Sequence, residues 1–168
     1  MIQSTETLKV MAHGDREIVI TREFDAPRNL VFDAFTKPEL LRQWLLGPPG
    51  WSMPVCEVDL RVGGKYRYVW RRINGNQMGM GGVYREIVRP ERIVTTEKFD
   101  EAMYPGEAVS TVLLLEEAAK TKLRQTVLYE SREARDAILQ SPMESGLAAS
   151  YHKLEQLLSA FNKEGTSL

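Results

Sequence analysis

The chain has 168 residues, of which 43% are hydrophobic and 27% charged, so we expect one folded domain rather than two domains or a disordered chain. Its net charge of -1, from 22 basic and 23 acidic residues, predicts no basic face and argues against nucleic acid as a partner. A single cysteine, Cys56, and two histidines exclude an internal disulfide and a histidine-rich metal site. We therefore expect no metal, no cofactor and a cytoplasmic location.

The ends of the chain are polar. The first residues lack the apolar segment of a secretory signal, and no run in the chain reaches the ~20 apolar residues that cross a bilayer. We expect a flexible lead-in over residues 1–15, one domain over residues 16–162 and a carboxy-terminal tail over residues 163–168.

The domain is predicted to begin with a strand and two short helices. Residues 16–24 alternate between apolar and polar side chains, which is typical of a strand with one buried face. Asp25 then suits a helix N-cap, with Pro27 in the first turn. Thr36 and Glu39 have the spacing of a capping box, which predicts the start of a second helix.

The middle of the chain reads as β-structure. Residues 47–50, Gly-Pro-Pro-Gly, end the second helix because proline and glycine do not continue it. Short gaps between the following strands imply antiparallel neighbours. We expect six further strands, at residues 53–61, 64–73, 77–88, 92–99, 109–117 and 121–130.

The last segment is helical in pattern. Ser131 suits the N-cap of a short helix that ends at Leu139, and Ser141 begins a second capping box with Pro142 at the first helical position. The apolar stripe that follows predicts a helix of ~20 residues, which is about 30 Å long and reaches across a whole sheet. The stripe consists of Met143, Leu147, Ser150, Leu154, Leu157 and Phe161, widened by Tyr151 and Leu158.

Four segments resemble one known family. The segments are FDAPRNLVFDAFTKPELLRQWLLGPPGW at 24–51, VDLRVGGKYRY at 58–68, GGVYREIVRPERIV at 81–94 and YESREARDAILQSPMESG at 129–146. Through them the chain resembles the START-like (SRPBCC) superfamily, and within it bacterial relatives of the C-terminal domain of the heat-shock-protein-90 ATPase activator. The resemblance implies an α+β helix-grip fold, in which a curved antiparallel sheet of about seven strands wraps around the long C-terminal helix. It also implies a largely apolar cavity between them, and Leu147 departs from the tryptophan that relatives often carry there.

Aromatic residues are the first candidates for ligand binding. Tyr66, Tyr68 and Trp70 alternate with charged residues, so the three rings share one face of a strand, as a cavity wall or as plain core. Trp44 and Trp51 flank the Gly-Pro-Pro-Gly loop, where they either gate a cavity mouth or anchor the loop.

A second group of candidates follows from the same alternation. Met78, Met80 and Tyr84 share one face of their strand, and methionine adapts to a ligand or to a core equally well. Glu97 shares a face with apolar neighbours, which makes it the one candidate acid or base, unless its place near a strand end lets it reach water. The remaining candidate ligand contacts are Tyr129 and, on the final helix as a lid, Met143, Leu147 and Tyr151.

Three functions fit these residues. The leading hypothesis is a binding protein for a small hydrophobic or amphipathic molecule. The second is an enzyme of the cyclase, aromatase or hydrolase kind, which would need Glu97, Tyr68, Tyr84 and Tyr129 to converge. The third, implied by the named relative, is association with a chaperone as a stress protein. A homodimer is a further hypothesis about partners, and fold alone does not choose among these functions.

Overall fold

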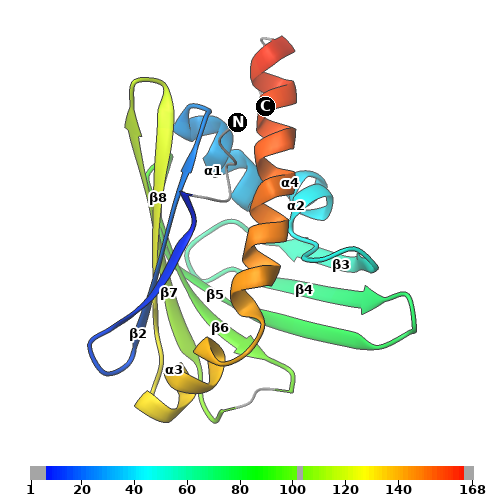
Figure 1. Ribbon diagram of the computed structural model, residues 1–168, viewed down its shortest axis with the longest axis vertical. Helices are drawn as coiled ribbons and strands as arrows, with labels where there is room; N and C mark the ends of the chain where they lie inside the picture. The colour runs from blue at the N-terminus through cyan, green and yellow to red at the C-terminus, as the bar shows by residue number, and fades with distance from the viewer. Residues whose placement is uncertain (1–6, 102–103, 165–168) are drawn as a thin grey trace.

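The strands of the chain form one curved, unclosed antiparallel sheet, and a long helix stands across its concave side (Figure 1). This architecture is that of a computed structural model, which describes residues 7–101 and 104–164. The predicted α+β helix-grip class is confirmed, with eight described strands where about seven were expected.

The order of the elements follows the prediction closely. The strand order across the sheet is β1-β2-β8-β7-β6-β5-β4-β3, and every neighbouring pair is antiparallel. The strands are β1 (Lys9–His13), β2 (Glu17–Phe24), β3 (Trp51–Val58), β4 (Lys65–Arg72), β5 (Gln77–Val88), β6 (Arg92–Phe99), β7 (Ala108–Glu117) and β8 (Lys120–Leu128). The helices are α1 (Arg28–Thr36), α2 (Pro38–Trp44), α3 (Arg132–Leu139) and α4 (Met143–Glu164).

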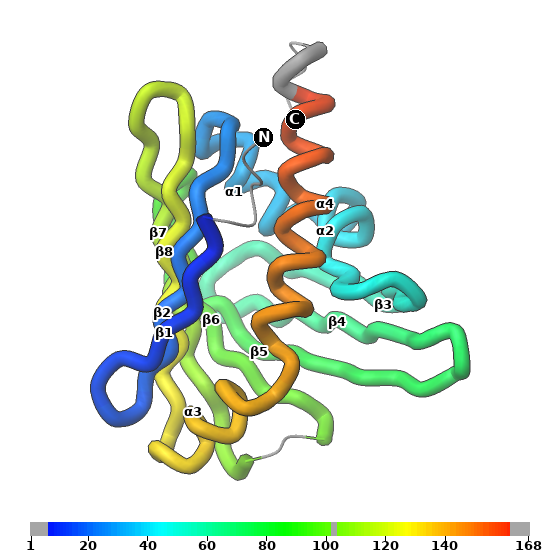
Figure 2. The backbone as a smooth tube through the Cα atoms, in the orientation of Figure 1, coloured from blue at the N-terminus to red at the C-terminus, as the bar shows by residue number. Residues whose placement is uncertain are grey.

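The short helices lie at opposite ends of α4. Figure 2 shows α1 and α2 beside the middle and later turns of α4, and α3 next to its beginning. Between the sheet and these helices lies an aromatic core, in which the ring of Tyr151 is 5.4 Å from Phe24 and 5.9 Å from Trp44. Aromatic pairs at these separations add to the stability that burial of the rings already provides. The middle of α4, at Tyr151, is therefore fixed to the core.

Strand β1 lies within the segment expected to be a flexible lead-in. Lys9–His13 pairs with β2 along its whole length, from Lys9 opposite Thr21 to His13 opposite Glu17. The sequence did not indicate this strand, because β1 is an edge strand whose side chains are mostly exposed. Without a buried face it shows no alternation of apolar residues. Residues 1–6 lie outside the described residues.

The first two helices begin without the predicted side-chain caps. Pro27 occupies the N-cap position of α1, and Lys37 that of α2, and neither makes a side-chain capping bond. The Asp25 N–H donates instead to Glu155 Oε2 of α4, at 3.2 Å. The Thr36 hydroxyl donates back to the carbonyl of Phe32 at 2.9 Å, so it ends α1 and does not cap α2. Thr36 therefore closes the end of α1, and the backbone N–H of Asp25 is bound by α4, while neither residue acts as the predicted N-cap.

The two carboxy-terminal helices follow the prediction. Ser131 caps α3, since its hydroxyl accepts from the Ala134 N–H at 3.0 Å. The Ser141 hydroxyl instead donates to the Ile138 carbonyl at 2.6 Å, and α4 begins at Met143. Helix α4 continues to Glu164, two residues into the predicted tail, and residues 165–168 lie outside the described residues.

Candidate functional site

Aromatic rings line the inner face of strands β4 and β5. Because side chains alternate along a strand, Tyr66, Tyr68 and Trp70 all point to the side of the sheet that carries α4, and all three are buried. Neighbouring ring centroids in this row are 5.0 and 5.8 Å apart. Tyr84 of β5 extends the row, with its ring 5.6 Å from that of Tyr66. These rings belong to the packed core and form one wall of the interior.

Hydrogen bonds fix the two ends of this wall. The Tyr66 hydroxyl donates to the Thr96 carbonyl at 2.6 Å, and the Trp70 indole N–H donates to the Leu45 carbonyl at 2.7 Å. The first bond needs the glycine opposite Tyr66, since a Cβ on Gly82 would lie 1.9 Å from the Thr96 oxygen. Both rings are therefore held as structural members, and their polar groups are already satisfied.

Glu97 is the charged group that faces this interior without a partner. It lies on β6, half-buried, on the same face as Ile93, Thr95 and Phe99. Within the described part of the chain, its carboxylate has neither a hydrogen bond nor an ion pair. Burial raises its pKa from the ordinary 4.5 to about 7. A carboxyl with such a pKa can give or take a proton at neutral pH, and it is an open acceptor for a ligand.

Tyrosines from four parts of the fold surround this carboxylate. In each of them burial is the main cause of a raised pKa, and the negative charge of Glu97 raises it further. They come from β4, from the loop before β7, from the end of β8 and from α4. They are Tyr66, Tyr68, Tyr104, Tyr129 and Tyr151. Tyr129 and Tyr151 are thus, like the β4 rings, buried where the charge of Glu97 acts on them, and their role as ligand contacts stays a prediction.

Tyr104 is the member of this group that the sequence did not indicate. It lies in the loop between β6 and β7, where no periodic pattern marks a residue as inward-facing. Its ring packs at 89° to that of Tyr129, with centroids 5.4 Å apart, and its hydroxyl is buried without a hydrogen-bond partner. Burial raises its pKa to about 12, and Glu97 adds to the shift. An unpaired buried hydroxyl is costly, so the group favours a polar partner.

The first half of α4 stands above this region without being fully buried. Met143 and Leu147 pack against the core yet stay half-buried, whereas Tyr151 is buried. A Cβ placed on Gly146 would meet no atom within 4 Å. The side of α4 that was predicted to form a lid is therefore only partly buried by other residues along its first two turns.

The remaining candidates are Trp44, Trp51, Met78 and Met80, and among them Met80 lies opposite Phe99, which shares the inner face of β6 with Glu97. Trp44 is fully buried, and its indole N–H donates to the Ala34 carbonyl at 2.9 Å, which makes it an anchor of the two short helices. Trp51 is half-buried at the start of β3. Met78 lies opposite Trp70 near the end of the β4–β5 hairpin and is 44% exposed, while Met80, opposite Tyr68, is half-buried. Of these four residues, only Met80 lies opposite a tyrosine on the neighbouring strand.

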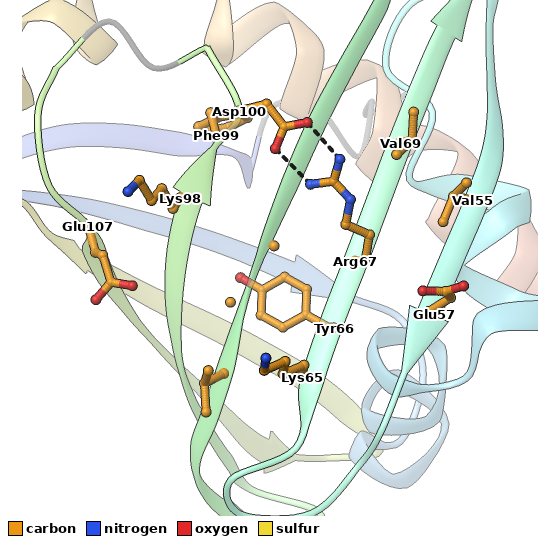
Figure 3. Close-up of a pocket in the computed structure, with 13 residues that line it drawn as sticks. Val55, Glu57, Lys65, Tyr66, Arg67, Val69, Lys98, Phe99, Asp100 and Glu107 are labelled. Atoms are coloured by element: carbon orange, nitrogen blue, oxygen red, sulfur yellow. Dashed lines mark hydrogen bonds and ion pairs between the residues drawn. The ribbon is translucent and has the colours of Figure 1, made fainter.

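A hollow of about 940 Å³ lies on the outer face of the sheet, away from α4 (Figure 3). Arg67 and Asp100 form a two-armed ion pair across it, at 2.7 and 2.6 Å. Gly79 makes room for that pair, because a Cβ there would lie 2.3 Å from the Asp100 carboxylate. No pattern in the sequence indicated this hollow. Its central cation and carboxylate, Arg67 and Asp100, are exposed and neutralise one another, so they have little to offer a ligand, and the interior is the better candidate.

Other kinds of site find no support in the described residues. No three histidine, cysteine or acidic side chains among them gather closely enough to hold a metal ion. Cys56 is a buried free thiol whose pKa is raised by burial to about 11, so it is a poor nucleophile. His13 and His152 are both exposed. None of the described helices combines the length and apolar character needed to span a membrane.

Comparison with known proteins places this geometry in a family. The model of the family described as Activator of Hsp90 ATPase homolog 1-like protein matches residues 25–159. A crystal structure of a protein from Rhodobacter sphaeroides is 30% identical, covers 92% of this chain and 99% of its own, and has a TM-score of 0.86. A protein from Chromobacterium violaceum is 31% identical over 85% of this chain and 96% of its own, with a TM-score of 0.75.

A more distant structure shares the fold. A protein from Plasmodium falciparum, described as an HSP90 activator, is 24% identical over 86% of this chain and 96% of its own, with a TM-score of 0.61. Among proteins with curated descriptions, none matches the chain.

Proposed function

Since the chain belongs to the Activator of Hsp90 ATPase homolog 1-like family, we propose that it is a cytoplasmic binding protein for a small hydrophobic or amphipathic molecule. The ligand lies between the inner face of β4–β6 and the first half of α4. The observation that carries the proposal is Glu97, a desolvated carboxylate without a partner in an interior of aromatic rings.

The energetics of Glu97 support a bound polar group. A charged or polar group in an apolar interior costs free energy unless it is hydrogen-bonded, and proteins rarely keep such a group without compensation. Tyr104 has the same deficit, because its hydroxyl is buried without a partner. A ligand with an apolar body and one polar end would satisfy such groups while it covers the half-buried Met80, Met143 and Leu147. Ligand sites in proteins commonly have this composition, mostly apolar with few polar groups.

The test is the binding of Nile red, a neutral apolar dye, measured by fluorescence titration and by displacement with decanol. Leu147→Trp fills the space beneath α4 and should weaken dye binding at least tenfold. Gln156→Trp adds the same ring to an exposed position of the same helix and should leave binding unchanged. Failure of dye and decanol to bind the native protein, or equal effects of both variants, would overturn the proposal.

Association with a chaperone is a second candidate, supported by the family description alone. Its measurement is the ATPase rate of a bacterial heat-shock-protein-90 chaperone with and without this protein. Stimulation that persists in Leu147→Trp would assign the activity to the outer surface rather than to the interior. An unchanged rate would exclude this role.

A further inference from the structure

The end of the β4–β5 hairpin carries a large, exposed apolar side chain at its apex, followed by Asn74, Gly75 and Asn76. Ile73, in its turn, is 93% exposed, the most exposed large hydrophobic residue that the structure describes. Its N–H donates to the Gly50 carbonyl at 2.9 Å, which joins the turn to the loop before β3. We call residues 47–51 and 71–78 together the hairpin tip. Figure 1 shows this end of β4 and β5 projecting beyond the other strands, on the side away from β1 and β2.

The hairpin tip combines apolar side chains with cations. Pro48 and Pro49 are exposed, and Trp51 is half-buried, with the Arg72 guanidinium 5.7 Å from the centre of its ring. Arg71 and Arg72 are both exposed, and within the described residues neither forms an ion pair with a carboxylate. The tip therefore presents uncompensated positive charge directly beside its apolar apex.

These arginines belong to a longer basic segment of the chain, which the near-neutral net charge of the whole protein conceals. From Leu60 to Arg85 the chain has no acidic residue, and its basic residues there are Arg61, Lys65, Arg67, Arg71, Arg72 and Arg85. Arg61 and Arg67 are neutralised by Asp59 and Asp100 of neighbouring segments. The charge that remains is concentrated on one hairpin, so the absence of a basic face expected from the whole-chain balance does not hold locally.

An anionic membrane surface fits both properties of the tip. Tryptophan and arginine are the side chains that suit the boundary between headgroups and acyl chains, and isoleucine suits the layer beneath. A nucleic-acid surface would leave Ile73 without a suitable contact, since such interfaces are polar and strongly basic. A stable protein interface needs roughly 1,000 Å² or more of complementary surface, whereas the tip is two narrow loops.

We propose that the hairpin tip docks on an anionic lipid surface, with Ile73 and Trp51 inserted at the acyl-chain boundary and Arg71 and Arg72 on lipid phosphates. The proposal is independent of the interior ligand site. It also suggests an entry route, because Met78 and then Met80 lead along the inner face of β5 from the tip towards the tyrosine row.

The test is co-sedimentation of the protein with phosphatidylcholine vesicles, with and without phosphatidylglycerol, over a range of salt concentrations. The native chain should bind vesicles that contain phosphatidylglycerol and should bind less as salt increases. The double variant Arg71→Gln/Arg72→Gln should bind about 30-fold more weakly, since each basic residue at an anionic surface contributes about fivefold. Ile73→Asp should also lose binding. Because Ile73 is exposed, this variant should stay folded, and circular dichroism checks that it does.

Val62 provides the matched control, because it is 65% exposed in the turn before β4, at the opposite end of that strand. Val62→Asp should bind vesicles as the native chain does. Absence of binding, equal binding to neutral vesicles, or equal losses in Val62→Asp and Ile73→Asp would each overturn the proposal. Dye binding in the interior is measured without vesicles, so failure of membrane docking leaves the proposed ligand site unaffected.

Discussion

Replacing Glu97 by glutamine is expected to make the protein more stable at neutral and alkaline pH. In the folded state the pKa of Glu97 is raised to about 7 by burial, from an ordinary value of 4.5. At roughly 1.4 kcal/mol per pKa unit, ionising this buried carboxyl costs about 3 kcal/mol of folding free energy. Glutamine has nearly the same shape and carries no charge, so Glu97→Gln removes that cost.

The sign of the effect depends on pH in a defined way. Below the unfolded-state pKa of 4.5 the carboxyl is protonated in both states, and the variant and native chains should differ little. Between there and about pH 7 the unfolded state loses its proton first, so the native protein loses stability as pH rises. Above that window the difference should stay constant at about 3 kcal/mol, which is on the order of 10 °C in the midpoint of thermal unfolding.

Urea unfolding of both proteins at a series of pH values measures the difference directly, because all other titrating groups are shared. Glu91→Gln is the matched control, since Glu91 is exposed in the turn between β5 and β6. Its effect should be small and independent of pH. If Glu97→Gln were less stable than the native chain above pH 7, or if the difference did not change with pH, Glu97 would have a partner and the reasoning would be refuted.

Three further substitutions test the backbone that shapes the site, each by the midpoint of urea unfolding. Ala119→Gly in the β7–β8 turn should stabilise by about 1 kcal/mol, because Ala119 has φ 64°, where a side chain is strained; no gain would contradict that strain. Gly82→Ala should destabilise by 2 kcal/mol or more, since the new Cβ would collide with the Thr96 carbonyl and overpacking costs ~1–3 kcal/mol. A much smaller loss of stability would show that β6 moves away freely. Gly146→Ala, where space is open, should instead stabilise by up to about 1 kcal/mol through helix propensity, and a loss there would mean that the space beneath α4 is occupied.

The fold was predictable where side chains are half-buried and unpredictable where they are not. Strands β5 and β6 and helix α3 have the predicted bounds, because each combines a clear period with a turn or cap at its start. Strand β1 was missed because an exposed edge strand needs no apolar face. The caps at Asp25 and Thr36 failed for another reason: Pro27 takes the N-cap position of α1, and the Thr36 hydroxyl donates back to the Phe32 carbonyl.

The sequence predicts which face of its strand each candidate residue occupies, but not how far along the strand it lies from α4. Alternation places Tyr68, Met78 and Glu97 on the inner face of their strands, and the sheet register agrees. It does not say how far along a strand a residue lies from α4, so Met78 was grouped with the site although it lies at the exposed hairpin end. Tyr104 could not be found, because a loop has no period to read.

The polar contacts of α4 to the rest of the fold begin at its third turn. Ser150 accepts from the Gly47 N–H at 2.8 Å, and Glu155 accepts from the buried guanidinium of Arg22 at 3.1 Å, so both ties lie beyond the first two turns of the helix. Truncating one partner of a buried ion pair costs several kcal/mol, which makes this attachment strong. The first two turns of α4 have no comparable tie among the described residues, and there Leu147 packs against the core while it stays half-buried. A ligand beneath those turns would add contacts to the least attached part of the helix without disturbing the core that holds the rest.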